Sequence, residues 1–448
     1  MIYDVQRSVA RAASWAVFAA ITLWGLAALP APVRAQRGTA QHLRLEEVYE
    51  AVLRDNPMLA ASRSRVRAAL ARAASSGVPP DPELQIGAMN YSATTLGPMA
   101  PLGMFQVQVM QMLPLAGKLS LSADGARERA SAVELRAEEL SWKLKAEAAE
   151  VYLDLYAVEE RLRISRESLR VLEDIAAAAA AMYEVGEGRQ ADVLRAQVEL
   201  SRMQEDTLAM RAMRQAMAAR LNALMNRPPA SPLAPTQSVE LPADLPSLEQ
   251  LLERADRTRP AIRASEREER AAATGLELAR RSLWPDLQVG LQYGQRSMDG
   301  RPERMVSFMV GASLPLFATR RQLREREEAA AELAMVRAEV DAMRAETRAE
   351  VAEVYAHVEH NRHLWTLYST TILPQAEANL VSALASYKVG QVDFMTLLDA
   401  FEALLRFRRE SVSLRAEEAK YWTKLEALLG THLLPHADAT AAHTGDVP

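Results

Sequence analysis

Four segments of the chain alternate between apolar and polar or small residues over several successive positions. They lie at 83–91, 105–110, 287–294 and 306–314, and in the second of them glutamines separate three apolar residues. Runs of about ten residues with period two are typical of strands that cross an outer membrane in a β-barrel, with one face toward lipid and one toward water. On the pattern alone, a half-buried strand of a soluble sheet is the alternative.

After the first strand pair, the hydrophobic pattern changes to a period of seven residues. From 126 to 185 there is neither Gly nor Pro, and two series recur every seven residues. They are Leu144, Val151, Val158, Ser165 and Leu172, beside Ala148, Leu155, Leu162, Leu169 and Ala176. This pattern predicts a coiled-coil seam on a helix roughly 90 Å long. Gly186 and Gly188 then predict a turn, followed by a return helix over 189–227.

The second half of the chain repeats this order of elements. Amphipathic helices are predicted from Leu45 to about Ser75 and from Leu248 to about Ser282, each before a strand pair. A second long helix is expected over 318–389 with a break near Pro374, then a turn at Gly390 and a return helix over 391–429.

An internal duplication explains the repeated order, because short motifs recur at a nearly constant distance. Asn56-Pro57 corresponds to Arg259-Pro260 (shift 203), Leu113-Pro114-Leu115 to Leu314-Pro315-Leu316 (shift 201), and Tyr183-x-x-Gly186 to Tyr387-x-x-Gly390 (shift 204). We therefore predict two repeats of helix, strand pair and long helical hairpin, at 36–230 and 248–434. A Pro-rich linker at 231–247 separates them, and a disordered tail follows at 435–448.

The N-terminus has the features of a secretory signal. Arg7 and Arg11 precede the apolar run 12–29, and Val33-Arg34-Ala35 fits the small-x-small cleavage pattern, so residues 1–35 are predicted to be removed. A retained membrane anchor is the alternative, because the apolar run is long for a signal.

Composition excludes several classes of function. The 448 residues are 49% hydrophobic but only 5% aromatic, which suits closely packed helices. The net charge of -5 and the interspersed signs give no basic face for nucleic acid. The absence of cysteine excludes disulfides, thiolate metal sites and a lipidated N-terminal cysteine. No nucleophile elbow or phosphate loop is present, so we expect neither an enzyme nor a cofactor.

Four strands are too few to close a barrel in lipid. Bacterial barrels begin at eight strands, and an open edge would leave backbone groups without hydrogen bonds. Two chains would supply eight strands with a filled interior, whereas three would supply twelve and leave room for a lumen. The function that follows is a passive conduit.

Taken together, the duplicated hairpins, the Tyr-x-x-Gly turns and the Leu-Pro-Leu junctions resemble the TolC-like outer-membrane efflux proteins over essentially all of the mature chain. Gln111-x-Leu113-Pro114-Leu115-x-Gly117-Lys118 is most similar to members paired with heavy-metal exporters. The resemblance implies a mainly α-helical homotrimer with one twelve-stranded transmembrane β-barrel, continued by a periplasmic α-helical barrel. It also implies contact with outer-membrane lipid, a periplasmic adaptor and an inner-membrane pump of the RND type.

The same resemblance implies roles for residues near the two turns. Asp192 and Asp399 match family carboxylates that select cations at the periplasmic entrance, although Thr396 stands where an acid is often found. Tyr183, Gly186, Tyr387 and Gly390 match the hairpin tips that contact the adaptor. From the sequence alone, the two aspartates are also explained as solvated residues favoured near a helix start.

Two sets of residues invite a metal-binding interpretation that we do not adopt. Met203, Met210 and Met217 recur every seven residues, but their counterparts in the second repeat cannot bind a soft ion in that way, so a packing seam is favoured. His357, His360 and His363 lie on adjacent helical turns without an HExxH motif, which favours a solvated face. A secreted periplasmic coiled-coil adaptor or structural protein is the alternative function, but an adaptor would normally have one hairpin.

Overall fold

The computed structural model describes residues 42–434, apart from 95–97, 100–102 and 299–300. Its first repeat contains α2 (Leu45–Asp55), α3 (Pro57–Ser75), β1 (Glu83–Met89), β2 (Met104–Leu113), α4 (Lys118–Glu184) and α5 (Gln190–Leu224). Its second repeat contains α6 (Leu248–Thr258), α7 (Pro260–Arg281), β3 (Leu287–Met298), β4 (Arg301–Ala312), α8 (Gln322–Leu367), the π-helical turn η1 (Tyr368–Ile372), α9 (Leu373–Lys388) and α10 (Phe394–Leu429). The predicted signal peptide and the predicted tail lie outside the described residues. Within the described ranges, no helix combines the length and the hydropathy needed to cross a membrane.

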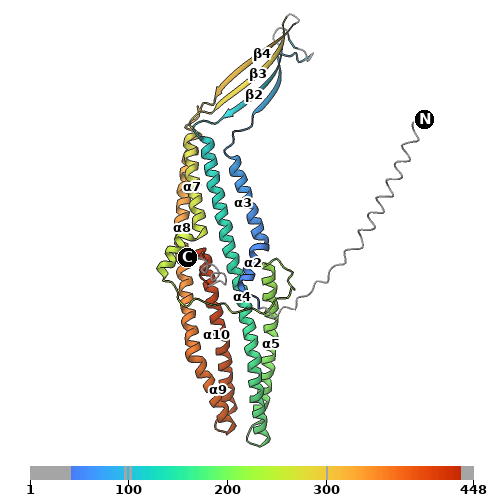
Figure 1. The fold of residues 1–448 in the computed structure, drawn as a ribbon, viewed down its shortest axis with the longest axis vertical. Coiled ribbons are helices and arrows are strands. Elements are labelled where there is room, and N and C mark those ends of the chain that lie inside the picture. Colours follow the sequence, from blue (N-terminus) through green and yellow to red (C-terminus); the bar gives the residue numbers. More distant parts are fainter. Residues whose placement is uncertain (1–41, 95–97, 100–102, 299–300, 435–448) are drawn as a thin grey trace, which may run out of the picture. The chain divides into compact units, whose positions relative to one another are not determined.

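The four strands form one antiparallel sheet in the order β1-β2-β3-β4, at the opposite end of the long helices from the two hairpin turns (Figure 1). Strand pairing aligns residues of like polarity across all four strands. Two apolar rows are Leu84, Val109, Leu291 and Phe308, and Ile86, Val107, Tyr293 and Val306; the row between them is Gln85, Gln108, Gln292 and Ser307. Successive residues of a strand point to opposite faces, so the sheet has one apolar face and one face on which polar residues are mixed with glycine and methionine.

The apolar face of the sheet is not covered by the protein's own core. Phe308 is 72% exposed and Val306 is 70% exposed, and the other members of the two apolar rows are exposed or half-buried. A half-buried strand of a soluble sheet would instead place these side chains against a core. The arrangement therefore fits a sheet whose apolar face meets lipid.

Each helix predicted before a strand pair is in fact two helices, which corrects the prediction of one continuous element over 45–75 and over 248–282. The interruptions fall at Asn56-Pro57 and Arg259-Pro260. Proline lacks the N–H needed for the helical hydrogen bond, and its ring clashes with the carbonyl four residues earlier. Asn56 then caps α3, because its Oδ1 accepts a hydrogen bond from the Met58 backbone N–H at 2.9 Å.

The long helices follow the predicted coiled-coil pattern. The side chains of Leu144, Val151, Val158 and Leu172 are all buried. The predicted break near Pro374 is wrong in kind, because the chain stays helical through η1 and into α9. A π-helical turn directly before a proline accommodates the missing hydrogen bond without ending the helix.

The segment predicted as a linker lies against the helices of the first repeat. The Thr236 backbone N–H and hydroxyl both donate to Glu159 Oε2, at 2.8 and 2.7 Å. Beside them, the Tyr152 hydroxyl lies 2.6 Å from the Leu43 carbonyl and accepts a hydrogen bond from the Gln237 N–H at 2.9 Å. The chain between the repeats is therefore anchored to α4.

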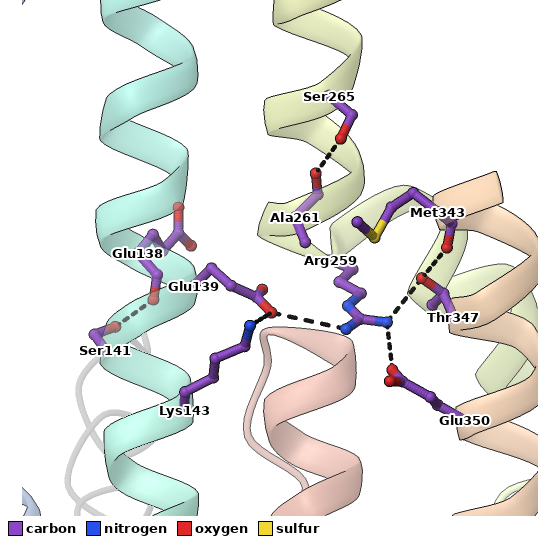
Figure 2. A network of polar contacts seen from close by, with 10 residues as sticks. All are labelled: Glu138, Glu139, Ser141, Lys143, Arg259, Ala261, Ser265, Met343, Thr347 and Glu350. Carbon is purple, nitrogen blue, oxygen red and sulfur yellow. Dashed lines mark hydrogen bonds and ion pairs between the residues drawn. The ribbon is translucent and has the colours of Figure 1, made fainter. Parts of the chain in front are cut away.

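A buried arginine joins the two repeats at the α6–α7 junction (Figure 2). Arg259 Nη1 donates to Thr347 Oγ1 at 2.7 Å and to Glu350 Oε2 at 2.8 Å, both on α8. Its Nη2 lies 3.8 Å from Oε1 of Glu139, a buried residue of α4 that also lies 3.6 Å from Lys143 Nζ. One guanidinium thus connects α4 of the first repeat to α8 of the second.

Candidate functional site

The two long hairpins both turn at a glycine in the left-handed region, as the sequence predicts. Gly186 has φ 80° and Gly390 has φ 68°. In the first turn the N–H groups of Glu187 and Gly188 donate to the Met182 carbonyl at 2.9 and 2.8 Å. Glycine adopts this conformation at no steric cost, so both positions are structural requirements of the turns.

The two tip tyrosines occupy different surroundings although they are duplicates. Tyr183 is 48% exposed, whereas Tyr387 is 5% exposed and packs edge-on against Phe394 with ring centroids 5.8 Å apart. The Tyr387 hydroxyl is buried without a hydrogen-bond partner. Only Tyr183 therefore presents its ring for contact with another molecule.

Asp192 lies in the first turn of α5, and its charge acts on Tyr387 of the other hairpin. Burial raises the pKa of Tyr387 above its ordinary value, and the negative charge of Asp192 raises that pKa further. The structure thus brings together two predicted site residues that are 195 positions apart in the chain (387 − 192). The two hairpins also share a buried core, which includes Ala196 of α5 and Tyr387 of α9.

Thr396, which stands where the family often has an acid, belongs to a helix cap. Asp393 Oδ1 accepts hydrogen bonds from the Thr396 backbone N–H at 2.9 Å and from its hydroxyl at 2.6 Å. These hydrogen bonds lower the pKa of Asp393 below its ordinary value. Sequence reasoning missed Asp393, but its signal was present, since an aspartate directly before a helical pattern is a typical N-cap.

Asp399 lies in a second group of charges further along α10. Partial burial, followed by the charges of Glu199 and Asp399, raises the pKa of Glu402 above its ordinary value, while Arg202 and Arg406 oppose the shift. Glu199 belongs to α5 and accepts from Arg202 Nη1 at 2.6 Å. Asp192 and Asp399 are therefore in separate clusters, and the second cluster contains charges of both signs.

Glu402→Gln is expected to raise the melting temperature at neutral pH and to leave it nearly unchanged near about pH 4. Because the pKa of Glu402 is raised in the folded protein, its ionisation opposes folding as pH rises through that pKa. Thermal unfolding of the purified protein across this range measures the effect. Glu410→Gln on the same helix is the control, and an equal gain from both changes would contradict the explanation.

The histidines and methionines considered from the sequence lie in different surroundings. His360 and His363 are exposed, as a solvated helix face requires, while Met210 and Met217 are half-buried. His357 stacks on Tyr421 with ring centroids 4.6 Å apart, and Met203 is buried in the core between the two hairpins. In the parts of the chain that the structure describes, no three His, Cys, Asp or Glu side chains are placed to hold a metal ion.

Comparison with protein families finds one match, and it occurs twice. A family model described as outer membrane efflux protein matches residues 48–227 and again residues 251–431. Each matched segment lies within one of the two repeats inferred from the sequence. Comparison with curated proteins finds no match.

Solved structures of outer-membrane channels share the fold. VceC from Vibrio cholerae has a TM-score of 0.73 at 20% identity, over 86% of this chain and 96% of that one. CusC, studied for its folding and transmembrane channel formation, has a TM-score of 0.74 at 19% identity, over 87% and 92%. The Neisseria gonorrhoeae MtrE channel in its open state has a TM-score of 0.70 at 18% identity, over 87% and 89%.

Proposed function

The chain belongs to the outer membrane efflux protein family, and from this membership we propose that three copies of it form a passive exit duct. It is an outer-membrane channel subunit that extends into the periplasm and works with a periplasmic adaptor and an inner-membrane pump. The family is one of transport conduits, not of enzymes. The proposal adds the homotrimer, a pump of the RND type, and an entrance at the hairpin tips.

The four-stranded sheet with its apolar face is the observation that carries the proposal. Among the described residues, its outer strands β1 and β4 each pair with one neighbouring strand, so each has one unpaired edge. An unpaired strand edge is costly in lipid, so the edges must pair with other copies. Three sheets supply twelve strands, enough for a lumen. The long helices that continue from each sheet would extend that lumen into the periplasm.

We further propose a role for each predicted part of the chain. Residues 1–35 direct secretion and are removed, 36–230 and 248–434 are the working repeats, 231–247 joins them, and 435–448 is a tail. Tyr183 and Gly186, with Tyr387 and Gly390, form the tips that meet the adaptor. The exposure of Tyr183 supports a contact role for the first tip, whereas Tyr387 is buried in the core that the two hairpins share, which supports a packing role for the second tyrosine.

Conductance in a planar lipid bilayer tests the duct directly. The purified protein is expected to produce discrete channel steps and to fractionate with the outer membrane. Recovery of the protein as a soluble periplasmic monomer that forms no channels would contradict the proposal and would favour the coiled-coil adaptor instead.

Asp192→Asn combined with Asp399→Asn is expected to lower the cation-to-anion permeability ratio about threefold or more, because carboxylates at a narrow entrance attract cations and repel anions. The reversal potential across a salt gradient measures the ratio. Asp244→Asn with Glu249→Gln removes the same charge from exposed positions near the linker and should leave the ratio unchanged. An unchanged ratio in the tip variant would show that these carboxylates do not select ions.

A further inference from the structure

Helix α3 carries an uncompensated positive charge. It contains Arg63, Arg65, Arg67 and Arg72 and no acidic residue. Its duplicate α7 instead carries four glutamates among its arginines.

Two of the arginines of α3, Arg65 and Arg72, make no ion pair within the described ranges. They line a groove of about 730 Å³ whose other cations are Arg136 and Lys143. The one acid in that groove, Glu139, is engaged with Arg259. The groove therefore supplies no free acidic partner for α3.

Helix α7, the duplicate of α3, makes ion pairs with a neighbouring helix on each of its two sides. On one side Glu268 pairs with Arg136 of α4, and Arg267 lies 3.1 Å from Glu128 of the same helix. On the other side Glu266 lies 2.7 Å from Arg344 of α8. Helix α7 thus links α4 of the first repeat to α8 of its own repeat, through ion pairs on both sides.

Two alanines buried on α4 and α7 have exposed duplicates. Ala271 of α7 is 2% exposed and Ala132 of α4 is 1% exposed. The duplicate of Ala271 is Ala68 of α3 (271 − 203), which is exposed. The duplicate of Ala132 is Met335 of α8 (132 + 203), which is 54% exposed. One face of α3 and one face of α8 therefore lack the partner that their duplicates have.

The two uncovered faces carry opposite charges. On α8, Glu332, Glu339 and Glu346 recur every seven residues; all three are exposed and make no ion pair with any described residue. Their duplicates on α4, found by subtracting 203, are Arg129, Arg136 and Lys143. The basic row of α4 has thus become an acidic row on α8. The change parallels the replacement of Glu268 on α7 by Arg65 on α3 (268 − 203 = 65).

We propose that the Arg65 face of α3 packs on the Glu339 face of α8 from a second copy of this chain, repeating the α7–α4 packing with its charges reversed. The pair Arg65–Glu339 is then the intermolecular counterpart of Glu268–Arg136. This inference rests on the homotrimer of the proposed function. Each copy supplies one basic and one acidic face, so the contact is head-to-tail and closes into a ring.

Charge reversal between the repeats also determines their order in the ring. If α7 packed on α8 of another copy, Glu268 would face Glu339. If α3 packed on α4 of another copy, Arg65 would face Arg136. Like charges placed together penalise both wrong arrangements, so only alternation of first and second repeats is favoured.

A charge-swap experiment on the full chain tests the pair. Arg65→Glu is expected to lower the ratio of trimer to monomer in detergent about tenfold or more, because each of the three contacts becomes repulsive. Glu339→Arg should do the same, and Arg65→Glu with Glu339→Arg in one chain should restore the trimer. Arg67→Glu is the matched control, because it makes the same charge change on the same helix and its duplicate Arg270 makes no ion pair with a described residue.

The outcomes separate the pair from the trimer on which it rests. A monomeric wild-type protein would contradict the homotrimer itself. A trimeric wild type that tolerates Arg65→Glu would overturn the pair alone. Loss of the trimer without restoration by the double swap would also overturn the pair, and would assign Arg65 to the groove that it shares with Arg136 and Lys143.

The absence of native cysteine allows a test of register. Cysteines at Arg65 and Glu339, joined by a short bifunctional maleimide, are expected to give covalent dimers and trimers on a denaturing gel. Cysteines at Arg65 with Glu332 or with Glu346 move the contact by one heptad and should react much less. More efficient linking of either shifted pair would overturn the Arg65–Glu339 register.

Discussion

Replacing Arg259 with Met is expected to lower the free energy of unfolding by about 3–5 kcal/mol. The guanidinium is 7% exposed and lies between carboxylates of α4 and α8. Glu139 is also buried, and one of its carboxylate oxygens has no partner. Once the guanidinium is removed, the exposed Lys143 is the positive charge that remains beside Glu139. An uncompensated buried charge accounts for most of the expected loss.

Two further variants separate this explanation from a general loss of packing. Arg257→Met, at the same junction, removes an exposed arginine that pairs with Glu253 and should change stability by no more than about 0.5 kcal/mol. Arg259→Met combined with Glu139→Met removes both buried charges and should regain most of the loss. Denaturant titration of the purified protein measures all three. A double variant no more stable than Arg259→Met would show that the charge on Glu139 is not the cause.

Gly430→Ala is expected to destabilise the protein by about 2–4 kcal/mol, from a strained backbone and a steric clash. Gly430 ends α10 with φ 63°, a conformation that costs L-residues free energy. A Cβ at this position would lie 2.6 Å from Pro260 Cδ and 3.2 Å from the Thr258 carbonyl oxygen. Because Thr258 Oγ1 also donates to the Leu429 carbonyl at 2.6 Å, the end of α10 and the α6–α7 junction have little freedom to separate.

Gly390→Ala is the matched control for the clash. Gly390 has φ 68° but no atom lies within 4 Å of where its Cβ would stand, so only the backbone cost of about 1–2 kcal/mol is expected. The difference between the two variants in the same denaturant titration measures the clash against Pro260. Equal losses would mean that the α10 end moves aside and that the tight packing there is unimportant.

The repeat architecture was predictable because it is recorded in local patterns. The alternation in the strands and the heptad series are each visible within one element, and the duplicated motifs are visible when the two halves of the sequence are compared. The double match of the family model confirms the duplication. The glycine turns were also predictable, because few other residues adopt a positive φ without strain.

The remaining features depend on contacts between distant segments. The clustering of Glu199 with Asp399 and Glu402 requires α5 and α10 to be neighbours, which no spacing along the chain reveals. The different burial of Tyr183 and Tyr387 is likewise invisible, since the duplicated motif is identical in both. The helix interruption at Pro57 was a different kind of error, because the local rule for proline predicts it and the amphipathic pattern was given more weight.

The pairing of strands from both repeats affects how the protein is delivered to the outer membrane. Val107 pairs with Tyr293, so the centre of the sheet joins strands separated by α4, α5, the linker, α6 and α7. The helical hairpins, by contrast, are built mainly from local contacts and are expected to form first. A newly secreted chain would then carry two apolar rows and unpaired strands in water, where such surfaces aggregate. We therefore expect transit across the periplasm to require a chaperone that shields the strands, with sheet formation completed only on arrival in lipid.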